Sequence, residues 1–340
     1  MNFRNLFLGL TTSTIAQDHP INYFDIGSRG GFQEDLLPLA FAVNAIGFEP
    51  EPSEFIKLNS RESSPWLTSK HLPFAISGDG GRQTLFISRG PQSASLLQHN
   101  MELGVRFDKT QFVEVEGKIE IETQTLSEAL ELANINSIDY LKIDIEGAEL
   151  EVFRSSPTIM DNILAVKTEV SFVEFRHDQP HAFEVEEFMK EKGFMLMDLV
   201  QPAHWRRQGY VIHPYTANEV PPYSRGQIVH GDYLFFRDPE TLGDEPEAHI
   251  KLALIAMALG YFDNSLMILE NRVARNYVSE RYGKSILEFI EPASRAYGRR
   301  VFWKTLYSQI RGLVPLIRYS RNVLRKQGSN IMPFHSNQER

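Results

Sequence analysis

The chain has 340 residues, of which 42% are hydrophobic and 23% are charged, as in an ordinary globular protein. It contains no cysteine, which excludes disulfides, thiolate nucleophiles and cysteine-bound zinc and suits a reducing compartment. The longest apolar run, residues 252–259, falls far short of the ~20 residues that cross a bilayer, and the N-terminal apolar stretch is too short for a signal sequence. We therefore expect a soluble, cytoplasmic protein.

Apolar runs and helical periodicities alternate along the first 240 residues. The apolar runs predict strands over residues 21–26, 46–49, 74–77, 111–123, 138–145, 163–172, 194–200 and 233–237, with 84–88 as the hairpin partner of 74–77. Helical spacing predicts helices over residues 32–45, 126–133, 148–155 and 183–192. This alternation is typical of a doubly wound, Rossmann-like α/β fold, in which helices cover both faces of a mostly parallel sheet. Residues 201–231 are predicted to form a long loop, and such loops are often functional.

The sequence divides into four regions. We expect a lead segment over residues 1–19, the α/β domain over 20–240, a helical C-terminal extension over 247–326 and a disordered tail over 327–340. Within the extension, two apolar segments predict a helical hairpin, residues 250–259 and 266–273.

Charge is distributed unevenly along the chain. Residues 293–338 contain nine basic and no acidic residues, whereas the whole chain has a formal charge of −9. The acidic body disfavours nucleic acid as a partner. In the basic segment, aromatic and aliphatic residues are interleaved with the charges, which is typical of an interfacial helix on anionic lipid at the cytoplasmic face of a membrane. A helix docked on the acidic body explains the pattern equally well, and Pro315 is predicted to interrupt it.

The first candidate binding motif runs from Asp25 to Gly31 and follows the first predicted strand. A tight glycine turn between a strand and a helix brings backbone N–H groups close to a ligand, and Gly27 and Gly31 permit close approach. An ordinary tight turn is the alternative interpretation. The glycine spacing lacks the dinucleotide pattern G-x-G-x-x-G, which argues against NAD.

Glu49 ends the second predicted strand, 24 residues after Asp25. A carboxylate at this point of such a fold can accept hydrogen bonds from both ribose hydroxyls of an adenosine group. The alternative is a solvated glutamate in a turn.

The third motif, residues 141–149, places Lys142, Asp144 and Glu146 on one face of a predicted buried strand. Three charges there are unfavourable unless they are paired or functional. Because ligands bind at the carboxyl ends of parallel strands, Asp144 is predicted to lie at the reacting end of the site. An ion-pair cluster of Lys142 with the carboxylates is the structural alternative.

Together the three motifs resemble the FkbM-type family of S-adenosylmethionine (SAM)-dependent methyltransferases, over residues 20–240. The family patterns D-x-G-A-N-x-G, F-E-P, S-D-x-x-G, L-K-I-D-x-E-G-x-E and E-V correspond to Asp25, Gly27 and Gly31, to Phe48-Glu49-Pro50, to Ser77, to Leu141 through Glu149, and to Glu169-Val170. This chain departs at two positions. Arg29 stands at the usual Asn, and Gly78 stands at the usual Asp, with Asp79 one place further.

The resemblance implies SAM as the cofactor and a small-molecule or glycan hydroxyl as the acceptor. The cofactor-binding residues that it implies are Asp25, Gly27, Ser28, Arg29, Gly31, Glu49, Pro50, Ser77 and Asp79. Among these, Arg29 is expected to pair with the cofactor carboxylate and Asp79 is the candidate for the adenine.

Methyl transfer to a hydroxyl needs positioning and a base. The candidates are Asp144, Glu169 and His177. A loop histidine such as His177 is often merely solvated, and the same applies to His204, His213 and His230 in the predicted long loop. Asp144 with Glu169 could also ligate a divalent metal, which no histidine-pair motif supports. A SAM- or nucleotide-binding scaffold and an NAD-dependent oxidoreductase are the rival functions.

Overall fold

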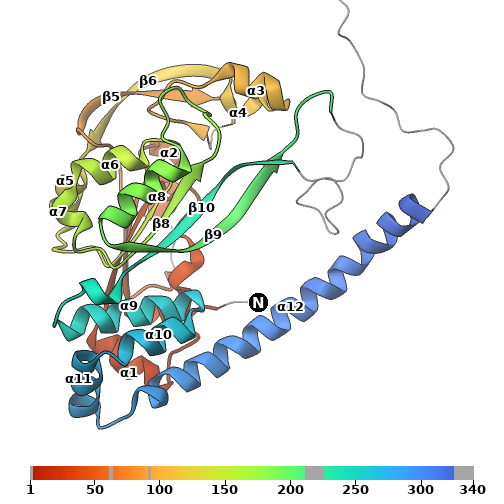
Figure 1. The fold of residues 1–340 in the computed structure, drawn as a ribbon. Helices are drawn as coiled ribbons and strands as arrows, with labels where there is room; N and C mark the ends of the chain where they lie inside the picture. Colours follow the sequence, from red (N-terminus) through yellow and green to blue (C-terminus); the bar gives the residue numbers. More distant parts are fainter. Residues whose placement is uncertain (1–2, 61–63, 91–92, 211–225, 325–340) are drawn as a thin grey trace, which may run out of the picture.

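The computed structural model describes residues 3–60, 64–90, 93–210 and 226–324. His213 and the segment 327–340, for which the sequence predicts disorder, lie outside the described residues. Figure 1 shows a central sheet with helices around it and one long helix that leaves the body.

Seven strands form the central sheet in the order β3-β2-β1-β7-β8-β10-β9. They are β1 (Ile21–Ile26), β2 (Val43–Phe48), β3 (Thr68–Leu72), β7 (Tyr140–Ile143), β8 (Ala165–Ser171), β9 (Phe194–Trp205) and β10 (Gln227–Arg237). The first five strands in this order are parallel neighbours, and β10 runs antiparallel between β8 and β9. This arrangement confirms the predicted α/β fold with a mostly parallel sheet.

The central strands are buried on both faces, which explains their nearly continuous apolar sequences. Neighbouring residues of one strand enter different cores: Tyr23 and Tyr140 pack on one side, and Phe24 and Leu141 pack on the other. The second side is covered by α5 (Leu126–Ala133), α6 (Glu149–Ser155), α7 (Pro157–Met160) and α8 (Ala182–Glu191).

The first side is covered by helices from both ends of the chain. They are α1 (Thr11–Asp18), the 3-10 helix η1 (Glu34–Ala42), α9 (Pro246–Leu259), α10 (Phe262–Leu269), α11 (Arg272–Tyr282) and the start of α12 (Ile286–Leu324). The helical hairpin predicted after residue 247 is present as α9 and α10. Its residues share one core with the sheet, so the extension packs on the α/β body.

Three strand predictions are wrong. The third strand of the main sheet is β3, whose exposed polar residues at the sheet edge gave no apolar signal. Segment 74–77 contributes only β4 (Ala75–Ile76), and β5 (Gly81–Ser88) pairs with β6 (Val115–Gln124), not with β4. These three strands form a separate sheet in the order β4-β6-β5. The predicted loop over 201–231 is shortened because β9 and β10 extend into it from both sides.

Two predictions involving proline are also wrong. The helix predicted over 32–45 is a 3-10 helix that ends at Ala42, because Pro38 in its middle cannot donate to an α-helical hydrogen bond. By contrast, α12 continues through Pro315, where an interruption was predicted. The remaining helices are α2 (Pro52–Asn59), α3 (Met101–Phe107), α4 (Thr110–Val113) and the 3-10 helix η3 (Pro239–Thr241). Within the described residues, no helix is both long and apolar enough to cross a membrane.

Candidate active site

The glycine turn after β1 passes directly under the backbone that follows β7. Gly27 has a φ of +82°, and a Cβ atom at this position would lie 2.1 Å from the carbonyl oxygen of Asp144. No side chain fits there, so Gly27 permits the contact between two strand ends. The sequence suggested collision with a cofactor as the reason for this glycine, whereas the structure shows collision with the protein backbone.

Asp25 is fully buried and holds the turn in place. Its Oδ2 accepts hydrogen bonds from the Tyr23 hydroxyl and from the N–H of Gln33, both at 2.8 Å. Its Oδ1 lies 3.3 Å from Nζ of Lys142. Asp25 therefore positions the turn through contacts made inside the protein.

Lys142 connects the ends of β1 and β7. Its Nζ donates to the carbonyl of Gly27 at 3.1 Å and lies 3.6 Å from the carboxylate of Asp144. Burial alone would lower the pKa of Lys142, but the carboxylates of Asp25 and Asp144 raise it above its ordinary value. For Lys142 the structure agrees with the ion-pair interpretation of the sequence.

Backbone donors of the turn are used within the protein. Ser28 donates to the Phe48 carbonyl at 3.2 Å, Gly30 to the Glu54 carboxylate at 3.2 Å, and Gly31 to the Ser28 carbonyl at 2.9 Å. The expected cradle of ligand-facing N–H groups is therefore not provided by these three residues. The Arg29 side chain is exposed on the turn, and its charge offsets part of the rise that burial causes in the pKa of Glu49.

Glu49 stands beside this turn because β2 pairs in parallel with β1. Its side chain is buried, with the residue only 3% exposed, and its Oε1 accepts the N–H of Glu51 at 2.9 Å. Burial raises the pKa of Glu49, against the opposing effects of the Glu51 hydrogen bond and Arg29. Pro50 follows it and is half-buried. The ribose-binding role of this buried carboxylate at the end of β2 stays a prediction.

The departure from the family pattern at Gly78 has a structural explanation. A Cβ atom at Gly78 would lie 2.5 Å from Oε1 of Glu151, and this oxygen already accepts the Gly78 N–H at 3.1 Å. A carboxylate from α6 thus takes the space that a side chain at 78 would need. Ser77 is buried, and its hydroxyl forms a hydrogen bond with the Thr123 hydroxyl at 2.7 Å, whereas Asp79 is exposed. Glu151 was not predicted, because its contact with Gly78 spans 73 residues.

A second group of acidic residues lies where β7 and β8 end. Asp144, Glu149 and Glu169 can place one carboxylate oxygen each within 4.8 Å of one another. These three residues could hold a divalent cation, and they include the pair predicted from the sequence. All three already have partners: Asp144 faces Lys142, Glu149 accepts the backbone N–H of Gly147 at 3.0 Å, and Glu169 lies against His230. The metal stays a prediction.

Glu146 pairs with Arg176 rather than with Lys142. Arg176 is buried and comes from the loop after β8, the same loop that carries His177. His177 itself is exposed, as is the adjacent Asp178. From this loop the structure therefore brings the Arg176 guanidinium, and not the His177 imidazole, to Glu146.

His230 lies against Glu169, one of these three carboxylates. Its Nδ1 lies 3.1 Å from Oε1 of Glu169, because β10 runs antiparallel beside β8. Burial, together with Asp144 and Glu149, raises the pKa of Glu169 well above its ordinary value. Burial lowers the pKa of His230. From the sequence, His230 was not preferred to the other histidines of the predicted loop as a base, since its strand was predicted to start at residue 233.

A further ion pair supports the same edge of the sheet. Lys167 lies 3.2 Å from Asp35 of η1 and 3.7 Å from Asp232 of β10. Asp35 also accepts the Tyr140 hydroxyl at 2.9 Å. Opposite charges thus alternate along the strand ends, so the buried ammonium groups are paired.

The strand order, the glycine turn after β1 and the acidic residue after β2 define a Rossmann-like methyltransferase fold. The family model of the methyltransferase FkbM domain matches residues 25–196, about half of the chain. The chain therefore belongs to the FkbM methyltransferase family, as the resemblance predicted. No curated protein matches the chain. His230 lies beyond the matched residues.

Proposed function

We propose that this methyltransferase uses SAM to methylate a hydroxyl group of a small molecule or glycan. The observation that carries the proposal is the pair of Glu169 and His230, 3.1 Å apart beside Asp144 at the ends of the parallel strands. Hydroxyl methylation requires a group that takes up a proton, and such a pair supplies one.

The residues around the glycine turn fit the cofactor. Glu49 would accept the ribose hydroxyls, and the exposed guanidinium of Arg29 would pair with the cofactor carboxylate. Asp79 and Glu151 are the acidic candidates for the adenine amino group. When bound, SAM supplies a methyl group activated by a sulfonium. The partly exposed carboxylate of Asp144, with 40% of its side chain accessible, favours a positive charge nearby.

Proton transfer falls to the Glu169–His230 pair. Nδ1 of His230 faces Glu169, which leaves Nε2 as the ring nitrogen that takes the proton of the acceptor hydroxyl. The carboxylate of Glu169 stabilises the resulting imidazolium. A cation held by Asp144 and Glu169 would favour the charged carboxylate of Glu169 that this step requires.

The rival functions have less support. An NAD-dependent oxidoreductase is disfavoured by the glycine spacing and by family membership. A binding scaffold has no need for a histidine against a carboxylate with an elevated pKa, because perturbed pairs of this kind are concentrated at catalytic sites.

Two measurements test the proposal. Calorimetric titration with SAM, S-adenosylhomocysteine and NAD should give binding of the first two alone. Turnover with methyl-labelled SAM is then measured on matched acceptors that carry a hydroxyl or an amine at the same carbon. Label transfer to the hydroxyl compounds supports O-methylation. Transfer to the amines alone, or SAM binding without any transfer across a broad panel of sugars, contradicts it.

A further inference from the structure

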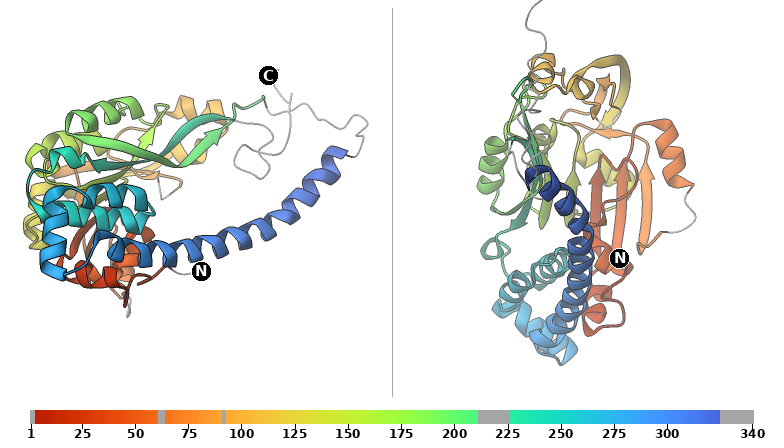
Figure 2. Two further views of the ribbon diagram at one scale, coloured as in Figure 1. Left: turned by 60° about the horizontal axis from the view of Figure 1, so that its bottom comes forward. Right: turned by 90° about the vertical axis from the view of Figure 1, so that its right-hand side faces the viewer.

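The helix α12 leaves the body after its first few turns. Ala293 is buried in the core, and Tyr297 contacts the rings of Phe3 and Phe262 at 5.2 and 5.4 Å. From residue 299 to residue 311 every side chain is exposed. Figures 1 and 2 both show α12 extending alone beyond the sheet and the other helices. The sequence left open whether this segment docks on the acidic body, and the structure shows that its start packs on the body whereas residues 299–311 are exposed.

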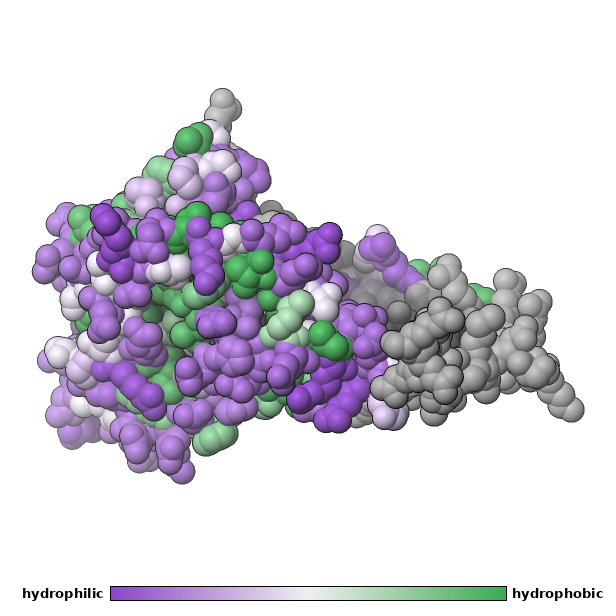
Figure 3. Space-filling view, turned by 90° about the horizontal axis from the view of Figure 1, so that it is seen from above, coloured by the Kyte–Doolittle hydropathy of each residue, from purple (hydrophilic) through white to green (hydrophobic). Residues whose placement is uncertain are grey.

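The projecting part of α12 carries a continuous exposed apolar face. Its members recur at spacings of three and four residues, which places them along one side of a helix. They are Trp303, Leu306, Tyr307, Ile310, Leu313, Val314 and Ile317, with exposures between 39% and 63%. The face is about 21 Å long at 1.5 Å per residue. By comparison, the face of the body seen in Figure 3 is mostly hydrophilic, with apolar residues in small groups.

Basic residues follow one edge of this face. Arg300, Lys304 and Arg311 are spaced by four and seven residues, so they lie on the same side of the helix next to the apolar stripe. The segment 293–338 has nine basic and no acidic residues. An apolar face bordered by lysine and arginine, with tryptophan and tyrosine in it, is the composition of helices that lie in the headgroup region of anionic membranes.

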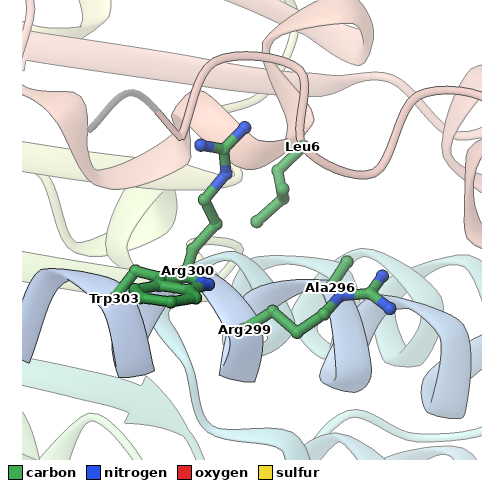
Figure 4. Close-up of a pocket in the computed structure, with 5 residues that line it drawn as sticks. All are labelled: Leu6, Ala296, Arg299, Arg300 and Trp303. Carbon is green, nitrogen blue, oxygen red and sulfur yellow. The ribbon is translucent and has the colours of Figure 1, made fainter.

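A pocket where the projecting segment leaves the body likewise combines apolar and basic side chains. It has a volume of about 320 Å³ and is lined by Leu6, Ala296, Arg299, Arg300 and Trp303. Figure 4 shows the Arg300 side chain extending from the helix toward the N-terminal segment that carries Leu6. Two guanidinium groups beside apolar walls suit a phosphate attached to an apolar chain.

We propose that α12 is a membrane anchor that lies in the plane of an anionic lipid surface, with the apolar face inserted and the basic edge against lipid phosphates. A second copy of α12 fits less well, because two such helices would bring like charges together with no acidic partner. Outside residues 293–338 the chain has a net charge of −18, which keeps the rest of the chain away from the same surface, so attachment is confined to this helix.

The test is co-sedimentation of the full chain with vesicles of phosphatidylcholine, with and without phosphatidylserine. Binding is expected to the anionic vesicles alone and is expected to disappear at high salt. Trp303→Phe should remove the blue shift of tryptophan emission that accompanies binding. Inorganic phosphate should not displace the protein, since the apolar face supplies part of the affinity.

Variants separate the two parts of the surface. Ile310→Asp with Leu313→Asp, and separately Lys304→Glu with Arg311→Glu, should each weaken vesicle binding about tenfold or more. Thr305→Ala with Ser308→Ala, on the opposite face, is the matched control and should bind as the wild type does. SAM affinity should be the same in all variants, which keeps this test independent of the proposed reaction.

Three outcomes would overturn the proposal. One is an absence of binding to anionic vesicles by the full chain. Another is unchanged binding in both double variants. The third is a stable dimer in light scattering that Ile310→Asp with Leu313→Asp converts to a monomer, because this would identify a second copy as the occupant of the apolar face.

Discussion

Glu169 and His230 form a close pair, with 3.1 Å between Oε1 and Nδ1, although they come from strands that run in opposite directions. The opposite shifts of their pKa values have one cause, since burial disfavours the charged form of each group. Burial thus favours the neutral form of both residues, and the neutral imidazole is the form that accepts a proton.

We expect His230→Gln and Glu169→Gln to reduce turnover at saturating SAM by ~10²-fold or more, because each removes part of the proton acceptor. SAM affinity should change little. His177→Gln is the matched control: its side chain is exposed, and the variant should retain nearly full turnover. Normal turnover in His230→Gln together with a loss in His177→Gln would return the base to the loop after β8.

The pH dependence of turnover follows from the same pair. Lowering the pH adds protons to Glu169, whose pKa burial raises, and to His230, whose pKa burial lowers. Both steps remove proton-accepting capacity, so the rate at saturating SAM should fall as the pH is lowered. Single-turnover rates across the pH range measure this. Glu169→Gln should flatten the profile, and a rate that rises on acidification would exclude the pair as the base.

Glu49 offers a test of the cofactor site. Glu49→Ala should weaken SAM binding by ~1–3 kcal/mol through the loss of charge-assisted hydrogen bonds. Since burial raises the pKa of Glu49, binding should also weaken on acidification in the wild type. Titration calorimetry measures both effects. Glu131→Ala, an exposed glutamate of α5, serves as the control. Equal affinities in the two variants would remove the ribose assignment.

The buried ion pairs give a prediction for stability. Lys142→Met should lower the free energy of unfolding by about 3–5 kcal/mol, because it leaves the buried carboxylate of Asp25 without its ammonium partner. Lys192→Met removes the pair with Asp161, whose side chain is 60% exposed, and should change stability by less than about 1 kcal/mol. Denaturant unfolding of the two variants compares them directly. A loss of stability in Lys142→Met as small as that in Lys192→Met would mean that the ion pair of Lys142 does not stabilise the fold.

The sequence predicted the parts of the fold that have a local signature. Buried strands such as β1 and β7 are apolar along their length, and the glycine turn and Glu49 follow them at fixed spacing. The strand β3 was missed because an edge strand can be polar. At the site, Asp144 and Glu169 were predicted from strand ends, but His230 was not, since its strand begins six residues earlier than its apolar run. Contacts between distant segments, such as Glu151 with Gly78, leave no local pattern.

A comparison of Gly27 and Gly30, two glycines of the same turn, distinguishes the cost of backbone conformation from the cost of a steric clash. Gly27 and Gly30 have nearly equal φ angles, +82° and +83°, but a Cβ atom at Gly27 would lie 2.1 Å from the Asp144 carbonyl, whereas at Gly30 no atom lies within 4 Å. Gly30→Ala should therefore lose only the left-handed backbone preference, about 1–2 kcal/mol. Gly27→Ala should lose considerably more, because the strand ends must move apart. Thermal unfolding of both variants decides the point: equal losses would mean that backbone conformation, and not the contact with Asp144, fixes the glycine at 27.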